Sequence, residues 1–310
     1  MRGIETRIQD IRHMVFTEVA KMAYQEEASV EKHIEKIPYE IIPGDVANFR
    51  NDVFLERAIV GERVRLAMGL PCRDAGNQAP ISEDVEAADR PETYYTPPLI
   101  NIIKFACNAC PEKRLIVTEG CMGCLAHPCM EVCPKDAVHL DRTIGRASID
   151  QDKCIKCGRC ATACSYNAII TQERPCAAAC GMDAIHSDSQ GKAEIDYDKC
   201  VSCGMCLVNC PFGAISDKSQ IFQIIRGIQS GEKIYAAIAP AFVGQFGPKV
   251  TSGKLRAAIK QLGFTDVFEV AIGADLCAVQ EADDFMENVP ERLPFMATSC
   301  CPAWSAMAKK

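Results

Sequence analysis

Sixteen of the twenty cysteines lie between residues 107 and 210, and their spacing suits metal binding. Two runs are nearly superimposable, "GRASIDQDKCIKCGRCATACSYNAI" and "GKAEIDYDKCVSCGMCLVNCPFGAI". Both have the pattern C-x2-C-x2-C-x3-C, and together they supply Cys154, Cys157, Cys160, Cys164, Cys200, Cys203, Cys206 and Cys210. A tight loop with this spacing can wrap three thiolates around three corners of one iron–sulfur cube.

This spacing is the signature of bacterial two-cluster ferredoxins. In that arrangement the fourth cysteine of each run starts a helix that leads away, so its thiolate binds the other cube. We therefore predict that the first three cysteines of the first run hold a [4Fe–4S] cluster together with Cys210. A second cluster is predicted on the first three cysteines of the second run together with Cys164.

A second, less regular set of cysteines shares the end of this pattern. Three segments supply it, "CNACPEK", "CMGCLAHPCMEVCPKDAV" and "RPCAAACGMDAI". The tail C-x3-A, followed by Val or Ile, occurs four times, at Cys133, Cys164, Cys180 and Cys210. Two further [4Fe–4S] clusters are therefore predicted, one on Cys121, Cys124, Cys129 and Cys180, and one on Cys107, Cys110, Cys176 and Cys133.

Zinc is the alternative metal for part of this second set of cysteines. The pairs Cys107/Cys110 and Cys121/Cys124 have nearly the spacing of a zinc ribbon. A zinc site there would leave Cys129, Cys133, Cys176 and Cys180 without a role. Sixteen cysteines satisfy four cubes, so His127, His139 and His186 are expected to lie at the surface.

Composition narrows the class of protein. The chain has 310 residues, 48% hydrophobic and 24% charged, with a net charge of -7 and no run rich in Lys or Arg, which argues against nucleic-acid binding. The longest apolar run, "IYAAIAPAFV", is too short to span a membrane, and the charged start "MRGIETRIQDIRHMVF" is unlike a signal peptide. We therefore expect a cytoplasmic protein, where clustered cysteines bind metal rather than form disulfides.

The elements that carry these motifs suggest three domains of an α+β protein. Residues 1–98 are expected to be a helical region and a linker, because apolar residues such as Ile11, Val15 and Val19 recur at helical spacing. A second helix is predicted after a cap at Asn51 or Asp52. Residues 99–218 form the predicted ferredoxin-like region. Residues 219–310 alternate helix and strand twice, which indicates an α/β domain.

The C-terminal segment resembles the catalytic domain of the [FeFe]-hydrogenases. The motif "TSCCPAW" is similar to that family's first active-site motif. The preceding text, "AAIAPAFVGQFG", "GKLRAAIKQLGFTDVFEV" and "GADLCAVQEADDF", extends the resemblance from about Tyr235 to Lys310. The motif and the element "RPCAAAC" look like the group B branch.

The resemblance implies an H-cluster, a [4Fe–4S] cube bridged by a cysteine to a two-iron unit. By position, Cys301 matches the cube ligand and Cys300 the cysteine that passes protons. Glu281 and Asp284 match carboxylates of the proton path, although Asp284 is shorter than the family's Glu. Two pocket-lining residues are matched by Pro240 and Ala241. The family's later motifs supply further ligands that do not occur here, so we expect a fragment that is inactive alone.

The function implied is electron transfer to a hydrogenase active site, with reversible reduction of protons to H2 in the complete protein. A ferredoxin or similar redox carrier and the hydrogenase maturation proteins are the implied partners. Two alternatives remain open. One is a polyferredoxin that carries electrons without catalysis, and the other is a sensory or assembly relative of the hydrogenases.

Overall fold

The computed structural model describes residues 5–25, 30–74, 76, 78–89 and 96–309. Residues 100–217 form one compact unit, and residues 5–99 together with 218–310 form the other. Helices and short strand pairs occur in both, which confirms the predicted α+β class. Among the described residues, no helix is both long and apolar enough to cross a membrane.

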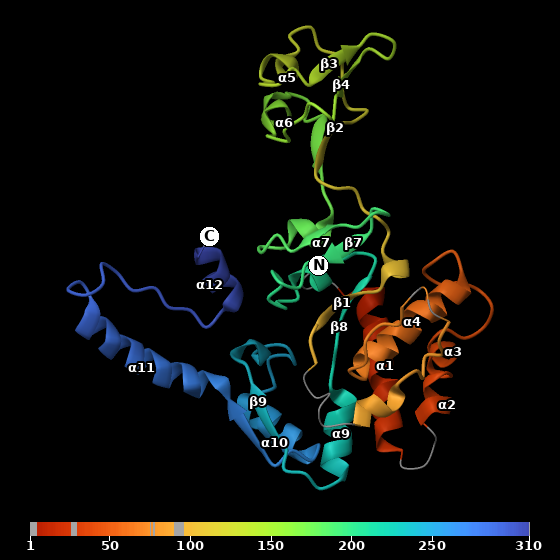
Figure 1. Ribbon diagram of the computed structural model, residues 1–310, viewed down its shortest axis with the longest axis vertical. Helices are drawn as coiled ribbons and strands as arrows, with labels where there is room; N and C mark the ends of the chain where they lie inside the picture. Colours follow the sequence, from red (N-terminus) through yellow and green to blue (C-terminus); the bar gives the residue numbers. More distant parts are fainter. Residues whose placement is uncertain (1–4, 26–29, 75, 77, 90–95, 310) are drawn as a thin grey trace. The chain divides into compact units, whose positions relative to one another are not determined.

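The N-terminal helices pack around one apolar core (Figure 1). They are α1 (Arg7–Tyr24), α2 (Val30–Ile34), α3 (Ile37–Ile41) and α4 (Val53–Ala67). Ile11, Val15 and Val19 are buried on one face of α1, as their spacing predicts. That helix packs against α4 and against α9 (Ile221–Gln229). The predicted helical region and its apolar face are therefore present, and α9 belongs to the same packed unit.

Buried charges fix the irregular segment after α4. The Arg65 guanidinium, 1% exposed, donates to the carbonyls of Pro71, Ile81 and Glu83 at 2.6–3.0 Å. The Glu62 carboxylate accepts from the backbone and side chain of Arg73. Because each buried charge has several partners, this segment follows a defined path that includes the short helix η1 (Val85–Asp89).

The cysteine-rich unit consists of four antiparallel strand pairs and short connecting helices. The pairs are β1 (Ile100–Ile102) with β8 (Ile215–Asp217), β2 (Arg114–Val117) with β5 (Ile169–Gln172), β3 (Val138–Asp141) with β4 (Arg146–Ile149), and β6 (Ile185–Ser187) with β7 (Ala193–Ile195). The helices are η3 (Lys104–Ala106), α5 (Pro128–Glu131), α6 (Arg159–Ala163), α7 (Pro175–Ala178) and α8 (Met205–Asn209).

These pairs define two modules of like construction, each with one hairpin and one pair that joins its first and last strands. The inner module, residues 114–172, contains β2 to β5 with α5 and α6 (Figure 1). The outer module, residues 100–110 and 173–217, contains β1, β6, β7 and β8 with α7 and α8. The inner module is thus inserted into the outer one.

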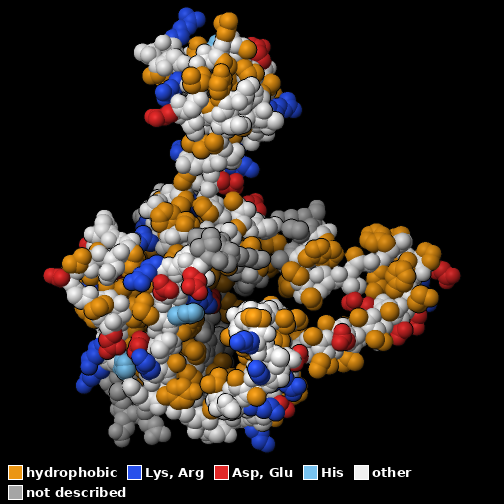
Figure 2. All heavy atoms as spheres, turned by 180° about the vertical axis from the view of Figure 1, so that it is seen from behind, with side chains coloured by type: hydrophobic (Ala, Val, Ile, Leu, Met, Phe, Trp, Pro, Cys, Tyr) orange, Lys and Arg blue, Asp and Glu red, His pale blue; other side chains and the backbone are white. Residues whose placement is uncertain are grey.

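The C-terminal segment alternates helix and strand as predicted. It contains β9 (Tyr235–Ile238), η4 (Pro240–Phe242), α10 (Ser252–Gln261), β10 (Asp266–Glu269), α11 (Val270–Asn288) and α12 (Pro302–Ala308). The strands β9 and β10 pair in parallel across α10, which is a βαβ unit. None of the described side chains of α11 is buried, and hydrophobic ones such as Leu276, Val279 and Met286 lie on its surface (Figure 2).

Candidate iron–sulfur sites

Four cysteine loops of the two modules share one backbone turn. Each contains a C-x2-C pair, and the residue before the second cysteine has a positive φ of 46–58°. These residues are Ala109, Gly123, Lys156 and Ser202. A left-handed residue reverses the chain sharply, and it costs energy for any residue except glycine. Its fourfold recurrence therefore indicates one loop architecture, which serves to bring paired thiols to a common point.

The repeated C-x3-A tail also has one structure. The sulfur of each tail cysteine accepts a hydrogen bond of 3.3–3.4 Å from the N–H of the alanine four residues later. The residue before that alanine has a positive φ in all four copies and is Asp136, Asn167, Asp183 or Gly213, types that tolerate this conformation. The four alanines, at most 2% exposed, are Ala137, Ala168, Ala184 and Ala214. The small residue thus lets the backbone approach the sulfur, and the N–H stabilises a thiolate.

The cysteines gather into four groups of four. Quartet A lines one cavity and consists of Cys107, Cys110, Cys176 and Cys210. Quartet B lines a second cavity and consists of Cys180, Cys200, Cys203 and Cys206. Quartet C lines a third cavity and consists of Cys121, Cys124, Cys129 and Cys164. In quartet D, Cys160 lies within electrostatic reach of Cys154 and Cys133, and Cys157 lies exposed in the same loop.

Each predicted group of three cysteines is brought together, but each receives a different fourth member. Cys164 lies with the Cys121 loop rather than with the Cys200 loop, and Cys210 lies in quartet A. Cys133 joins quartet D and Cys180 joins quartet B. The predicted fourth partners are therefore wrong. The exchange takes place between the halves of one module, and the two runs most alike in sequence belong to different modules.

Zinc does not suit these groups. The four cysteines of the proposed ribbon are divided between quartets A and C. In a tetrahedral site with Zn–S bonds near 2.3 Å, neighbouring sulfurs are about 3.8 Å apart. Among the described residues, no three cysteine sulfurs lie within 4.8 Å of one another. The sulfurs of each quartet are therefore not gathered as closely as a single zinc ion requires.

Burial and chemistry of the donors also fit iron–sulfur clusters. Burial raises the pKa of the Cys206 thiol to about 12 and that of Cys176 to about 11. The cavity of quartet B has an apolar lining apart from the cysteines, and that of quartet A adds only Asn108 and Arg174 to cysteines and apolar residues. Buried thiols surrounded by apolar groups bind soft metals in exchange for their protons. These sixteen side chains would hold the clusters.

Two residues next to the quartets were not predicted to matter. Arg174, directly before Pro175 and Cys176, is 3% exposed and lines the cavity of quartet A. His127 holds the same place before Pro128 and Cys129, and its Nε2 atom is buried with no hydrogen-bond partner among the described residues. The His127 residue itself is half-buried, whereas His139 and His186 are exposed, as expected. The shared signal is a polar residue before a Pro-Cys pair.

The predicted hydrogenase-like residues lie in the C-terminal segment. Cys300 and Cys301, both exposed, precede α12, and the Glu281 carboxylate on α11 accepts a 3.0 Å hydrogen bond from the Thr298 hydroxyl. This bond connects the carboxylate to the irregular segment that precedes the cysteine pair. Asp284, one turn along α11, accepts from the Gln280 amide at 3.2 Å.

The remaining two predicted residues stand apart from this group. Pro240 and Ala241 lie in η4, directly after β9. Among the described residues, no hydrogen bond joins them to the cysteine pair. The segment thus brings Glu281 near the cysteines through Thr298, but it does not assemble a closed site from all six residues.

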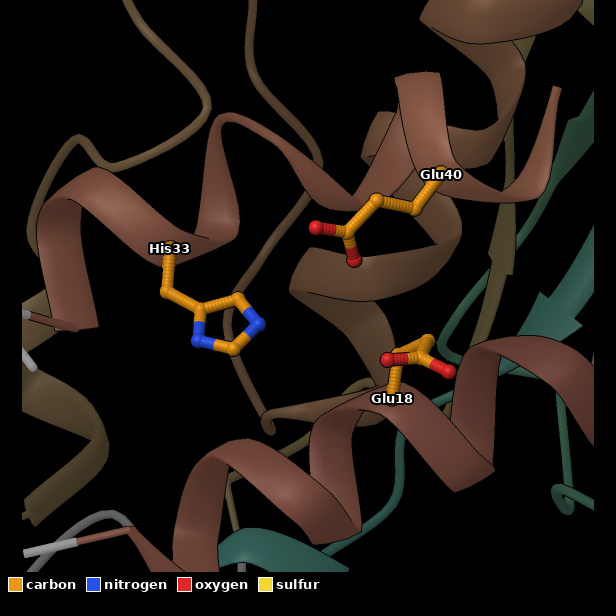
Figure 3. A group of neighbouring side chains, drawn as sticks. All are labelled: Glu18, His33 and Glu40. Carbon is orange, nitrogen blue, oxygen red and sulfur yellow. The ribbon is translucent and has the colours of Figure 1, made fainter. Parts of the chain in front are cut away.

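A mixed group of polar side chains lies outside the cysteine-rich unit. Glu18, His33 and Glu40 come from α1, α2 and α3 and point toward one another (Figure 3). Their ligand atoms lie within 4.8 Å. The Lys21 ammonium, 2.7 Å from the Glu18 carboxylate, already neutralises one of them. With one of its carboxylates paired to a lysine, this group is a polar cluster of the helical region.

Comparison with known proteins agrees with the two kinds of site. Residues 232–310 match the model of the C-terminal domain of the iron only hydrogenase large subunit. Residues 146–169 and 192–215 match a 4Fe-4S binding domain. The chain therefore carries a 4Fe–4S ferredoxin-like region followed by part of the hydrogenase large-subunit domain.

The similar curated proteins are of both kinds. Iron hydrogenase 1 of Clostridium pasteurianum is 32% identical over 68% of this chain and 38% of its own length. The NADP-reducing hydrogenase subunit HndD of Solidesulfovibrio fructosivorans is 30% identical over 50% of this chain and 28% of its own. An uncharacterized ferredoxin of Methanocaldococcus jannaschii is 40% identical over 20% of this chain and 43% of its own. The chain thus spans less than half the length of each of these relatives.

Proposed function

We propose that this protein transfers electrons through four [4Fe–4S] clusters, held by quartets A to D. The main support for this proposal is that the same C-x2-C loop and the same C-x3-A tail each occur four times, around four groups of four cysteines. Such clusters accept and release one electron at a time. The chain holds them, and its backbone N–H groups tune the sulfurs by hydrogen bonding. A cytoplasmic location, where thiols are kept reduced, suits these ligands.

Iron and sulfide analysis of the anaerobically reconstituted chain tests this function. We expect about sixteen irons and as many sulfides, because each of four cubes contains four of each. Electron paramagnetic resonance after reduction should show the signals of reduced clusters. About eight irons, or tightly bound zinc, would contradict the proposal.

We further propose that the electrons serve a hydrogenase active site, begun here and completed by segments like those of the longer relatives. The match of residues 232–310 to the hydrogenase domain and the adjacent cysteines Cys300 and Cys301 support this proposal. Cys301 would bind the cube of the H-cluster, and Cys300 would pass protons toward Glu281 and Asp284. Pro240 and Ala241 would line the pocket. The H-cluster, when bound, supplies the chemistry that interconverts protons, electrons and H2.

A ferredoxin or a similar small redox carrier would deliver the electrons, and maturation proteins would supply the two-iron unit. In a chain that contains the remaining ligands, Cys301→Ala should abolish the infrared bands of bound CO and cyanide. Cys300→Ala should keep these bands but lower turnover by orders of magnitude, since only the proton path is cut. Equal loss of the bands in both variants would give Cys300 a structural role instead.

A polyferredoxin without catalysis is the second candidate. The similarity to two uncharacterized ferredoxins, each over about a fifth of the chain, favours it. It predicts full cluster content with no infrared bands of CO or cyanide in any form of the chain that has been exposed to the maturation proteins.

A further inference from the structure

We propose that Arg174 raises the reduction potential of the cluster held by quartet A, and so makes this quartet the preferred place for an electron in the cysteine-rich unit. This inference rests on the proposed function, because it requires a [4Fe–4S] cluster at quartet A. Arg174 acts here as a positioning and electrostatic residue and is not a ligand.

The Arg174 guanidinium is buried at this site and held from several sides. It donates to the Cys110 carbonyl from Nε at 3.3 Å and from Nη2 at 2.8 Å. It also donates to the carbonyls of His186 at 3.0 Å and Gly191 at 2.7 Å, and to the Ser187 hydroxyl at 3.0 Å. The side chain therefore joins the loop of Cys110, the start of α7 and the β6–β7 hairpin in one fixed position.

All of these acceptors are neutral. Among the described residues, no carboxylate lies within ion-pair distance of Arg174, and the nearby Asp188 is engaged by Lys104 at 2.8 Å. A guanidinium keeps its charge at any pH that a protein survives. A permanent positive charge, not paired with any described carboxylate, thus lies beside quartet A and within electrostatic reach of Cys110 and Cys176.

The cavities of quartets B and C offer no such charge. Their described lining residues are cysteines and other uncharged side chains. In quartet C the corresponding position is His127, which does not line the cavity. In quartet D, Arg159 directly precedes Cys160, but its side chain is exposed and screened by water. The two modules therefore differ in the residue at a matched position.

The charge acts on the energy of reduction. One-electron reduction adds a negative charge to a cluster, and a cation fixed in a low-dielectric surrounding stabilises that charge more strongly than one in water. Hydrogen bonds, net charge and solvent exposure are the known determinants of cluster potential. Arg174 changes the net charge beside quartet A, and its hydrogen bonds to the Cys110 carbonyl hold that charge in place.

Redox titration of the reconstituted full chain, followed by electron paramagnetic resonance, tests the inference. The variants are Arg174→Gln, Arg174→Lys and the exposed control Arg159→Gln, with Cys110→Ala to identify the step that belongs to quartet A. Arg174→Gln should lower the potential of that step by at least 59 mV, a tenfold change in the equilibrium constant of a one-electron couple. Arg174→Lys should keep most of the wild-type potential, and Arg159→Gln should leave every step unchanged.

Iron content separates the possible failures. If wild type binds far fewer than about sixteen irons, the proposed function is wrong. If Arg174→Gln is fully loaded and titrates like wild type, the inference is wrong and the function stands. If Arg174→Gln loses iron, the loaded Arg174→Lys variant decides. Its side chain keeps the positive charge, so a quartet A potential as low as those of the steps that remain in Cys110→Ala would show that the charge has no effect. Loss of iron in every Arg174 variant would reduce the residue to a purely structural role.

Discussion

At the scale of single residues, mutation of the fourth cysteine of a run should destroy the cluster of the quartet to which that cysteine belongs. Cys164→Ala should release the cluster of quartet C, because Cys164 lies with Cys121, Cys124 and Cys129. Alkylation of the native protein followed by mass spectrometry should then label those three thiols. In the control Cys180→Ala, the labelled thiols should be those of quartet B, Cys200, Cys203 and Cys206. Labelling of quartet B in Cys164→Ala would restore the pairing expected from sequence.

Cys72 lies outside the quartets and should be unreactive. Burial raises the pKa of its thiol to about 12, and the Glu62 carboxylate adds to this effect. Below pH 9 the thiol is protonated in the folded and the unfolded chain, so its contribution to stability is complete there. Between pH 9 and about 12 only the unfolded chain loses the proton, so stability falls as pH rises through this window.

Iodoacetamide at pH 9 provides the measurement for Cys72. The exposed Cys277 should be alkylated quickly, since a thiolate is the nucleophile and access is free. Cys72, which is half-buried and has a raised thiol pKa, should be labelled far more slowly than Cys277 in the folded protein. Labelling of both cysteines at the same rate would contradict the raised pKa.

At the scale of elements, α4 organises the N-terminal region and depends on its cap. The Asp52 side chain accepts hydrogen bonds from the N–H groups of Phe54 at 2.7 Å and Leu55 at 3.0 Å. Asp52→Ala should destabilise the helix by about 1 kcal/mol, whereas Asp52→Asn should cost only a few tenths because asparagine also caps. Hydrogen exchange of the α4 amides measures the difference. Equal protection in the two variants would show that packing alone holds the helix start.

The repeated elements were predictable, and their pairing was not. The C-x2-C loops, the alanine tails and the cap at Asp52 are local, so sequence alone identified them. Which half-units share a module depends on β1 pairing with β8 and β2 with β5, contacts between residues far apart in the chain. Similarity between the runs at Cys154 and Cys200 reflects like loops and carries no information about which loops meet.

At the scale of the whole molecule, the sequence indicated both the iron–sulfur region and the hydrogenase-like segment. It did not indicate Arg174, because a single arginine before a proline has no distinctive spacing. The sequence also suggested that α9 belongs to a different domain from the N-terminal helices, whereas burial of Phe222 and Ile225 places that helix in their core. Tertiary burial of this kind becomes visible only when the partners of each apolar face are known.

The insertion of the inner module into the outer one has a consequence for biosynthesis. As the chain leaves the ribosome, Cys107 and Cys110 emerge first, yet quartet A is complete only when Cys210 has followed. At 5–20 residues per second, that interval is roughly 5–20 s, during which the inner module can fold and take up iron. A chain ended after residue 172 should accordingly bind about eight irons, all in quartets C and D. The first cluster ligands made would then be among the last to receive metal.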